Sequence, residues 1–176
     1  KELSKTHKCK FYVQINKPLT AKYFMHPAGN VYINEKMFKM LVPLLDCQKF
    51  LHKAERYNNQ DIDINLDIFR KLPVSLHVNS ARWYFHITGI QTDLSFPYLD
   101  VEPHKTIKDK IVIHRTFRYR NFFINYKFLN NYDNLLFIGM KNEYEDLKKD
   151  VKNIEFYDCK DFLEMAMIIK SCKFFI

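Results

Sequence analysis

The sequence predicts an α/β fold built on parallel sheets, and two observations support that prediction. Between residues 107 and 176, short apolar runs typical of buried strands alternate with stretches long enough for helices. This alternation is typical of parallel strands joined by right-handed crossovers. A segment with Pro97 and Pro103 separates this region from a less regular one before it. We therefore expect two halves, residues 1–103 and residues 104–176.

The first half is expected to contain two strands and two helices of ordinary length. Residues 9–16 alternate apolar and polar side chains, which predicts a strand. Residues 35–45 repeat methionine and leucine at three- and four-residue intervals, which predicts an amphipathic helix. Residues 61–69 alternate again and predict a half-exposed strand, and residues 77–89 predict a helix closed by its last residue, a glycine. Shorter elements are expected as well: a helix end at 1–7, a helix or turn at 21–26, and extended segments at 30–33 and 55–57.

The second half is expected to repeat a strand and a helix three times before a last strand. The predicted strands are residues 111–114, 135–139, 154–157 and 172–176. The predicted helices are residues 124–131, residues 142–151, and a third that starts at 158 or at 160–161 and ends at 170. Such a series forms a parallel sheet of four strands.

The net charge of the chain indicates which classes of binding partner are expected. The formal net charge of +8 favours contact with something anionic. Nucleic acid, an anionic lipid surface and a phosphorylated ligand are all compatible with it. Lysines are spread along the chain without a dense basic run, so no specific nucleic-acid surface is expected. No apolar run approaches the ~20 residues that a membrane span needs.

Motifs of several enzyme classes are absent from the sequence. There is no GxSxG, no Walker loop and no GxGxxG, which argues against serine hydrolases and against the common phosphate-binding loops. The four cysteines form no CxxC pair and the seven histidines are dispersed, so we expect reduced thiols, a cytoplasmic location and no metal site. The 16 phenylalanines and 11 tyrosines are expected mainly in the core.

Three arginines directly follow the strand predicted at residues 111–114. Ligands of an open parallel sheet bind outside the carboxyl ends of its strands. Arg115, Arg118 and Arg120 are therefore candidates for a diphosphate site, because guanidinium groups pair with phosphate oxygens in a fork. Thr116 adds a hydroxyl and a backbone N–H. The alternative is a solvated basic loop that pairs with an acidic side chain of a neighbouring element.

A second candidate site follows the strand predicted at residues 135–139. Gly139 would let a ligand approach the backbone, and Met140 would pack on a base. The Glu143 carboxylate would accept hydrogen bonds from ribose hydroxyls. The alternative is an ordinary strand-to-helix turn, in which Glu143 favours the first turn of the helix.

Together these features give residues 111–176 a resemblance to a known family. They comprise a strand with a basic loop, a strand ending in glycine before a helix with an acidic residue, and the helix opening Asp-Phe-Leu-Glu-Met before a last strand. This pattern is similar to the C-terminal domain of glycosyltransferases resembling the bacterial heptosyltransferases. That family implies two Rossmann-like parallel-sheet halves, each incomplete in this chain. The first half would bind the acceptor and the second the nucleotide-sugar donor.

The resemblance also implies site residues and a reaction. The donor diphosphate would face the loop residues Arg115, Thr116, Arg118, Arg120 and Asn121. The nucleoside would be lined by Gly139, Met140, Glu143, Phe162, Leu163 and Glu164. The implied reaction is transfer of a sugar from a nucleotide-diphosphate sugar to a glycan or lipid-linked acceptor, without a metal or other cofactor. The family's first strand with its Gly-rich loop, and its turn after the last strand, are expected outside residues 1–176, so no catalytic residue is assigned and we expect an inactive fragment.

Two other classes of function remain as alternatives. One is a non-catalytic module of the same fold that binds a nucleotide or nucleotide sugar. The other is a basic protein that binds nucleic acid. For a bacterial glycosyltransferase we expect a cytoplasmic location, with peripheral contact at the inner face of the membrane left open, and the sequence indicates no oligomeric state.

Overall fold

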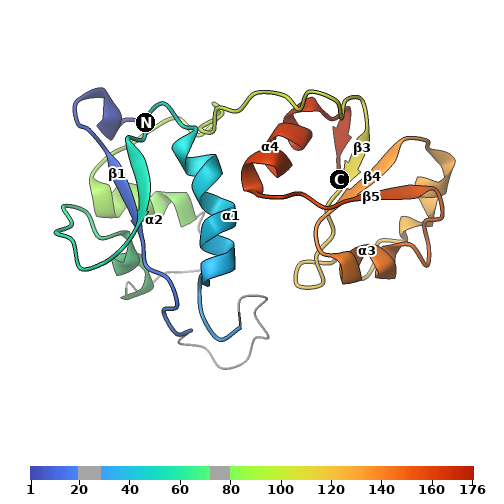
Figure 1. The fold of residues 1–176 in the computed structure, drawn as a ribbon, viewed down its shortest axis with the longest axis horizontal. Coiled ribbons are helices and arrows are strands. Elements are labelled where there is room, and N and C mark those ends of the chain that lie inside the picture. The colour runs from blue at the N-terminus through green and yellow to red at the C-terminus, as the bar shows by residue number, and fades with distance from the viewer. Residues whose placement is uncertain (20–28, 72–79) are drawn as a thin grey trace. The chain divides into compact units, whose positions relative to one another are not determined.

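The computed structural model describes residues 1–19, 29–71 and 80–176 (Figure 1). The chain divides into two compact units: the first comprises Lys1–Asn34 and Lys49–Asp100, and the second comprises Glu35–Gln48 and Val101–Ile176. The helix within residues 35–48 therefore belongs with the second unit, although it comes early in the sequence. The helix or turn predicted at 21–26, and the start of the helix predicted at 77–89, lie outside the described residues.

In the residues that the structure describes, the first unit contains a parallel pair of strands and one α-helix. Strands β1 (Lys10–Val13) and β2 (Lys53–Arg56) pair along their whole length, and their buried side chains are Val13 and Ala54. Helix α2 (Ser80–Thr88) ends before Gly89, whose φ of +67° is the left-handed conformation that favours glycine. The predicted strand at 9–16 and the predicted end of the helix at Gly89 are both confirmed.

The strand predicted at residues 61–69 is wrong. Residues 66–71 form a short 3₁₀ helix, η2 (Leu66–Lys71). The Asn65 side chain accepts a hydrogen bond from the backbone N–H of Asp67 at 3.0 Å, which turns the chain where a strand would continue. Ile62 and Ile68 are both exposed, so the alternation of the sequence marks a surface segment. Of the other short predictions, the extended segment at 55–57 overlaps β2, whereas residues 1–7 contain only the 3₁₀ helix η1 (Leu3–Lys5), and within 30–33 only Val31 forms a bridge, to Pro18.

The second unit is built on four parallel strands in the order β5-β4-β3-β6. They are β3 (Ile111–Ile113), β4 (Leu135–Ile138), β5 (Ile154–Tyr157) and β6 (Phe174–Phe175). Strand β3, the first along the chain, pairs with β4 on one side and with β6 on the other. The four predicted strands and their parallel pairing are confirmed, so the protein is a mixed α/β protein whose described part contains one two-stranded and one four-stranded parallel sheet.

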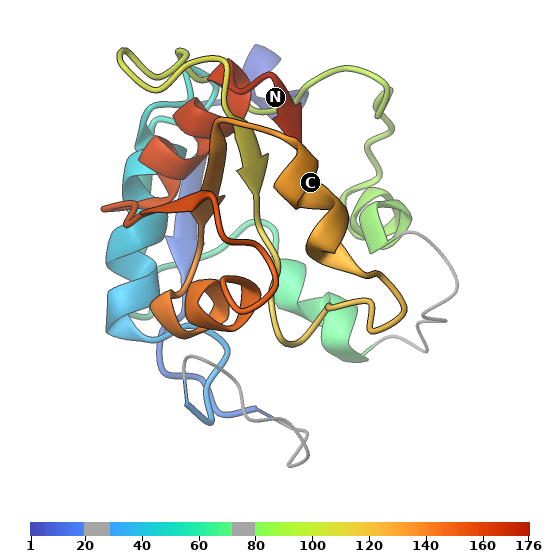
Figure 2. The ribbon, with the colours of Figure 1, turned by 90° about the vertical axis from the view of Figure 1, so that its right-hand side faces the viewer.

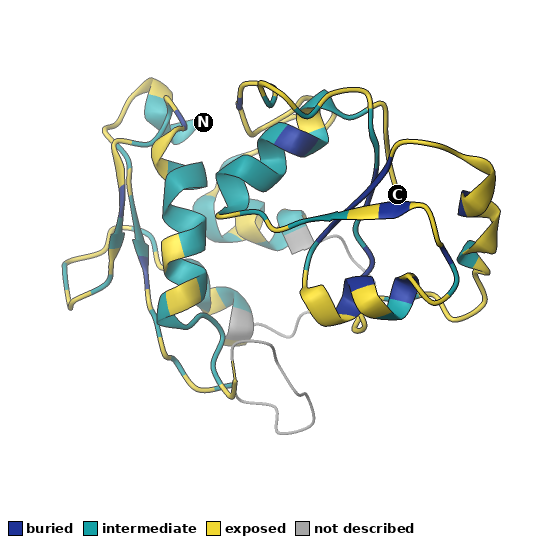
Figure 3. Cartoon of the chain, turned by 45° about the vertical axis from the view of Figure 1, so that its right-hand side comes forward, coloured by how far each residue is buried: buried dark blue, intermediate teal, exposed yellow. Residues whose placement is uncertain are grey.

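Helices cover both faces of this sheet (Figure 2). On one face, β4 places Leu135 and Phe137 against Leu147 of α3 (Lys141–Leu147) and Leu129 of the 3₁₀ helix η3 (Tyr126–Asn131). On the other face, the remaining β4 residues pack against Ile168 of α4 (Phe162–Ser171). All four β4 side chains are buried, and Figure 3 shows this core in dark blue. Residues 124–131, predicted as an α-helix, form the shorter η3.

Helix α1 (Glu35–Asp46) is the amphipathic helix predicted at 35–45, and it contacts α4 within the second unit. Pro43 lies inside it without ending it. Among the residues that the structure describes, no helix combines the length and the apolar character needed to cross a membrane.

Candidate functional site

The carboxyl ends of the four parallel strands lie at one edge of the second unit's sheet. The strand order reverses between β3 and β6, which is where open sheets of this kind form a ligand crevice. Two groups of described side chains include residues that follow the carboxyl ends of these strands. The first is the β3–η3 loop, residues 114–125, together with the start of α3. The second is a cavity beside α4, which follows β5.

In the β3–η3 loop, two of the three predicted arginines share one carboxylate. Arg115 is 5% exposed, and its guanidinium donates to Oδ2 of Asp146 on α3 at 2.5 Å. Arg120 donates to the same oxygen at 2.8 Å. The Arg115 guanidinium also lies over the ring of Tyr126, 5.3 Å from its centre. These two arginines therefore fasten the loop to α3, as in the basic-loop alternative stated above.

Asp146 is ionised by this arrangement. Burial on its own raises the pKa of the Asp146 carboxyl, but hydrogen bonds from Lys149 and Arg115 and the positive charges of Arg115 and Arg120 outweigh it. The net effect is a pKa below the ordinary value. The sequence gives little sign of this role, because Asp146 is one acidic residue among several on α3 and lies 31 positions from Arg115.

The remaining residues of the predicted diphosphate site lie toward the exposed part of the loop. Arg118 is exposed and its guanidinium lies 5.0 Å from the centre of the Tyr119 ring. The Thr116 hydroxyl accepts a hydrogen bond from the Tyr119 backbone N–H at 3.2 Å. The Asn121 side chain accepts one from the Phe123 N–H at 2.9 Å. Both side chains thus shape turns of the loop.

Glu143 connects the loop to the start of α3. Its side chain is buried, with Oε1 accepting from the Phe117 backbone N–H at 2.9 Å and Oε2 from the Met140 N–H at 3.4 Å. Gly139, at a φ of +143°, lies close to His114: a Cβ there would be 3.2 Å from the His114 Nδ1, which itself pairs with the Ile138 carbonyl at 2.8 Å. These contacts support the alternative stated above, an ordinary strand-to-helix turn in which Glu143 stabilises the start of the helix. Met140 is 41% exposed beside it.

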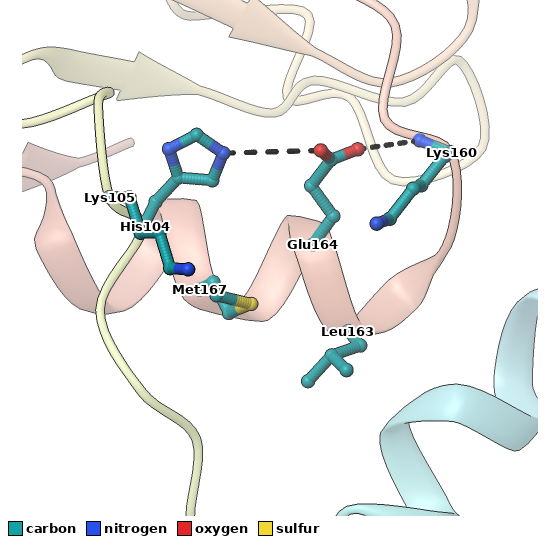
Figure 4. A pocket seen from close by; sticks show the side chains of 6 residues that line it. All are labelled: His104, Lys105, Lys160, Leu163, Glu164 and Met167. Atoms are coloured by element: carbon teal, nitrogen blue, oxygen red, sulfur yellow. Dashed lines mark hydrogen bonds and ion pairs between the residues drawn. The ribbon is translucent and has the colours of Figure 1, made fainter.

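The second group of side chains surrounds a cavity of about 380 Å³ beside α4 (Figure 4). It is called the α4 cavity below. His104 and Lys105 come from the segment before β3, Lys160 from the loop after β5, and Leu163, Glu164 and Met167 from the first two turns of α4. The backbone N–H of His104 donates to the Met167 carbonyl at 3.0 Å, which holds the segment against the helix.

Hydrogen bonds orient the Glu164 carboxylate at this cavity. Its Oε2 accepts from the Lys160 backbone N–H at 2.8 Å, and its Oε1 lies 3.1 Å from the Tyr157 hydroxyl. The Asp161 side chain caps α4 by accepting from the Glu164 N–H at 2.8 Å. The Glu164 carboxylate is therefore fixed beside the cavity by the Tyr157 hydroxyl and by the Lys160 N–H just before α4.

His104 faces the same carboxylate. Its Nδ1 accepts from the backbone N–H groups of Ile107 at 3.0 Å and Thr106 at 3.3 Å. A ring nitrogen that accepts carries no proton, so the proton of the neutral ring is on Nε2. That nitrogen lies 3.9 Å from Oε1 of Glu164. His104 thus presents a donor on the side of the ring that faces Glu164.

Two neighbouring groups are held in their protonated forms. Burial, together with the hydrogen bond to Glu164 and its negative charge, raises the pKa of the Tyr157 hydroxyl. Burial and the charges of Glu164, Asp158 and Asp161 raise the pKa of the Cys159 thiol to about 12. Cys159 is therefore a thiol at neutral pH and a poor nucleophile.

The structure distributes the predicted nucleoside residues between the two groups. Leu163 and Glu164 line the α4 cavity, whereas Phe162 is half-buried at the start of the helix and is not among the lining residues. Gly139, Met140 and Glu143 lie with the β3–η3 loop. Sequence reasoning missed the four other lining residues His104, Lys105, Lys160 and Met167. A periodic pattern does not show which distant segment packs beside a helix.

Within residues 1–19, 29–71 and 80–176, no group of three or more His, Cys, Asp or Glu side chains is placed to hold a metal ion. Comparisons of the chain with known protein families, with curated proteins and with solved structures found no match.

Proposed function

We propose that the second unit binds the nucleoside diphosphate of a nucleotide sugar, and that the chain is part of a glycosyltransferase with two Rossmann-like domains. The observation that carries this proposal is the α4 cavity. One of its lining residues, Lys160, lies in the loop after the carboxyl end of β5, and the cavity combines apolar, anionic and cationic side chains in a space of about 380 Å³. Small-molecule sites commonly have volumes of roughly 300–1,000 Å³ and a few placed polar groups.

Each part of a nucleotide has a counterpart in the α4 cavity. Leu163 and Met167 offer an apolar surface on which a base or a ribose ring would pack. The Glu164 carboxylate, fixed by the Lys160 N–H, would accept hydrogen bonds from ribose hydroxyls. The ammonium groups of Lys105 and Lys160 would attract phosphate oxygens.

Sugar transfer needs positive charge beside the departing diphosphate, because negative charge grows there as the glycosidic bond breaks. The two lysines of the cavity supply such charge. In this proposal the donor is a nucleotide-diphosphate sugar, no metal is required, and the first unit contributes to binding the glycan or lipid-linked acceptor.

A second candidate is a module of the same fold that binds a nucleotide without transferring a sugar. The observation that favours it is the pairing of Arg115 and Arg120 with Asp146. Two of the three guanidinium groups that would stabilise a leaving diphosphate already share a carboxylate. Both candidates require nucleotide binding at the α4 cavity, and they differ only in turnover.

Isothermal titration calorimetry with ADP, UDP and GDP tests the binding shared by the two candidates. We expect at least one of these nucleotides to bind, and Lys160→Ala and Glu164→Gln each to weaken that binding about tenfold, which corresponds to roughly 1.4 kcal/mol. The matched control for a lost positive charge is Lys108→Ala, an exposed lysine that does not line the cavity. Absence of binding to all three nucleotides, or equal effects of Lys160→Ala and Lys108→Ala, would contradict the proposal. Release of free sugar or nucleotide from the corresponding nucleotide sugars would then favour an enzyme over a binding module.

A further inference from the structure

The β3–η3 loop exposes aromatic side chains at its tip, which differs from the expectation that phenylalanine and tyrosine lie mainly in the core. Phe123 is 99% exposed, and Phe122 and Tyr119 are each 77% exposed. Phe117 and Ile124, on either side of them, are 44% and 45% exposed. Neighbouring apolar side chains that are this exposed mark a binding surface.

The exposure of the tip is a consequence of how the loop is held. At its base, the Arg115–Asp146 pair and the hydrogen bond from the Phe117 N–H to Glu143 fix the loop to α3. At its tip, the Asn121 side chain accepts from the Phe123 N–H and its carbonyl accepts from the Ile124 N–H at 3.3 Å. The loop is therefore a turn with its own hydrogen bonds, and its aromatic side chains need little ordering before they bind.

Positive charge accompanies these aromatic side chains. Residues 115–132 contain four cationic side chains and no acidic one, and two of the four, Arg115 and Arg120, pair with Asp146 of α3. Arg118 lies over the Tyr119 ring, and Arg120 over the Phe122 ring at 5.2 Å from its centre. Lys127 is exposed at the start of η3. An apolar tip with cationic side chains around it is the composition that suits the interface of an anionic bilayer.

We infer that the β3–η3 loop is a peripheral membrane anchor that inserts Phe122 and Phe123 into the interface of an anionic lipid bilayer. The phenyl groups would leave water for the acyl-chain boundary, and Arg118 and Lys127 would contact lipid phosphates. This inference goes beyond the proposed function and does not depend on it, because it uses neither the α4 cavity nor a nucleotide.

The same features argue against two other binding partners for the tip of the β3–η3 loop. A second copy of this chain would bring another positively charged loop against this one, so like charges would oppose the contact. Stacking on single-stranded nucleic acid would use the aromatic rings, but it gives no reason for Ile124 to be exposed beside them. Both occupants are outcomes that the experiment below distinguishes.

Co-sedimentation of the full chain with vesicles tests the inference. We expect binding to vesicles of phosphatidylcholine mixed equally with phosphatidylglycerol, and little binding to phosphatidylcholine alone. The double variant Phe122→Ser/Phe123→Ser should lower the partition coefficient at least about tenfold, since two apolar side chains no longer leave water. The matched control is Phe96→Ser/Tyr98→Ser, which removes two exposed aromatic side chains elsewhere in the chain, 69% and 67% exposed.

A second measurement reports insertion directly. A Phe123→Trp variant, in a Trp83→Phe background, should be quenched by bromine atoms on the acyl chains of anionic vesicles. Equal vesicle binding by the two double variants, or no quenching of the tryptophan at position 123, would overturn the inference. So would binding of a single-stranded oligonucleotide, or dimerisation in solution, that replaces vesicle binding and is lost in Phe122→Ser/Phe123→Ser.

Discussion

Arg115 and Asp146 form an ion pair that joins the loop after β3 to helix α3. The two side chains are 4% and 24% exposed, and Arg120 shares the same carboxylate. Removing one partner of a buried pair leaves the other charge without compensation, which is costly even where the intact pair adds little stability. The pair therefore determines where the β3–η3 loop lies.

The first prediction concerns Asp146→Asn. We expect this variant to lower the free energy of unfolding by about 2–3 kcal/mol, because the buried Arg115 guanidinium loses its counter-charge. Urea denaturation measures the change. Glu145→Gln is the matched control, since it removes an exposed carboxylate from the neighbouring position of the same helix and should change stability by less than about 0.5 kcal/mol. Equal losses in the two variants would show that the pair is not what stabilises the loop.

The second prediction concerns pH. The pKa of Asp146 is lower in the folded chain than its ordinary value of 3.8, so the unfolded chain binds the proton more tightly. The stabilisation is therefore complete above that ordinary value and is lost as the pH falls through the lower pKa of the folded state. The difference in unfolding free energy between the parent chain and Asp146→Asn should be largest at neutral pH and should shrink as the pH falls below 3.8. A difference that stays constant across this range would contradict the assignment.

The third prediction concerns Gly139→Ala. Its φ of +143° strains any residue with a side chain, and the new Cβ would lie 3.1 Å from the Phe137 ring and 3.2 Å from His114. We expect a loss of about 2–3 kcal/mol in unfolding free energy. Gly89→Ala is the comparison, because its φ is also positive but no atom lies within 4 Å of a Cβ there. It should cost only about 1 kcal/mol. If the two variants lost similar amounts of unfolding free energy, the close contact between position 139 and His114 would not contribute to the loss.

The fourth prediction concerns the thiols. A pKa of about 12 keeps Cys159 protonated, whereas Cys47 is exposed on the segment after α1. Alkylation with iodoacetamide in the folded state, followed by peptide mass mapping, should modify Cys47 first and Cys159 last. After denaturation the two should react at similar rates. Early modification of Cys159 in the folded chain would contradict the burial and the raised pKa of this thiol.

The strands of the second unit were predictable because each is a short, continuous apolar run between helices of ordinary length. Leu135–Ile138 is the clearest case, since all four side chains are buried on two covered faces. Residues 61–69 were not predictable in the same way. Alternation there indicates only that one side of the segment is more apolar. A strand also needs a neighbouring strand with free backbone groups. The Asn65 side chain instead forms a local turn with the Asp67 N–H.

The candidate site was predictable only in part. Position after a strand identified the β3–η3 loop, but the partner of Arg115 lies on α3, and no local pattern shows which of its acidic side chains faces the loop. Glu143 was consistent with a ligand and with a capping role, and only coordinates show the bond from the Phe117 N–H. The α4 cavity depends on His104, which packs beside Met167 from a segment that precedes the sheet.

Nucleotide binding at the α4 cavity is the central claim, and photo-crosslinking locates it most directly. An azido-purine or azido-uridine nucleoside diphosphate is irradiated with the full chain, and the labelled peptide is identified by mass spectrometry. Labelling within residues 160–167, suppressed by the unmodified nucleotide and reduced in Glu164→Gln, is the predicted result. Specific labelling of the first unit instead, with residues 104–105 and 160–167 unlabelled, would contradict the claim.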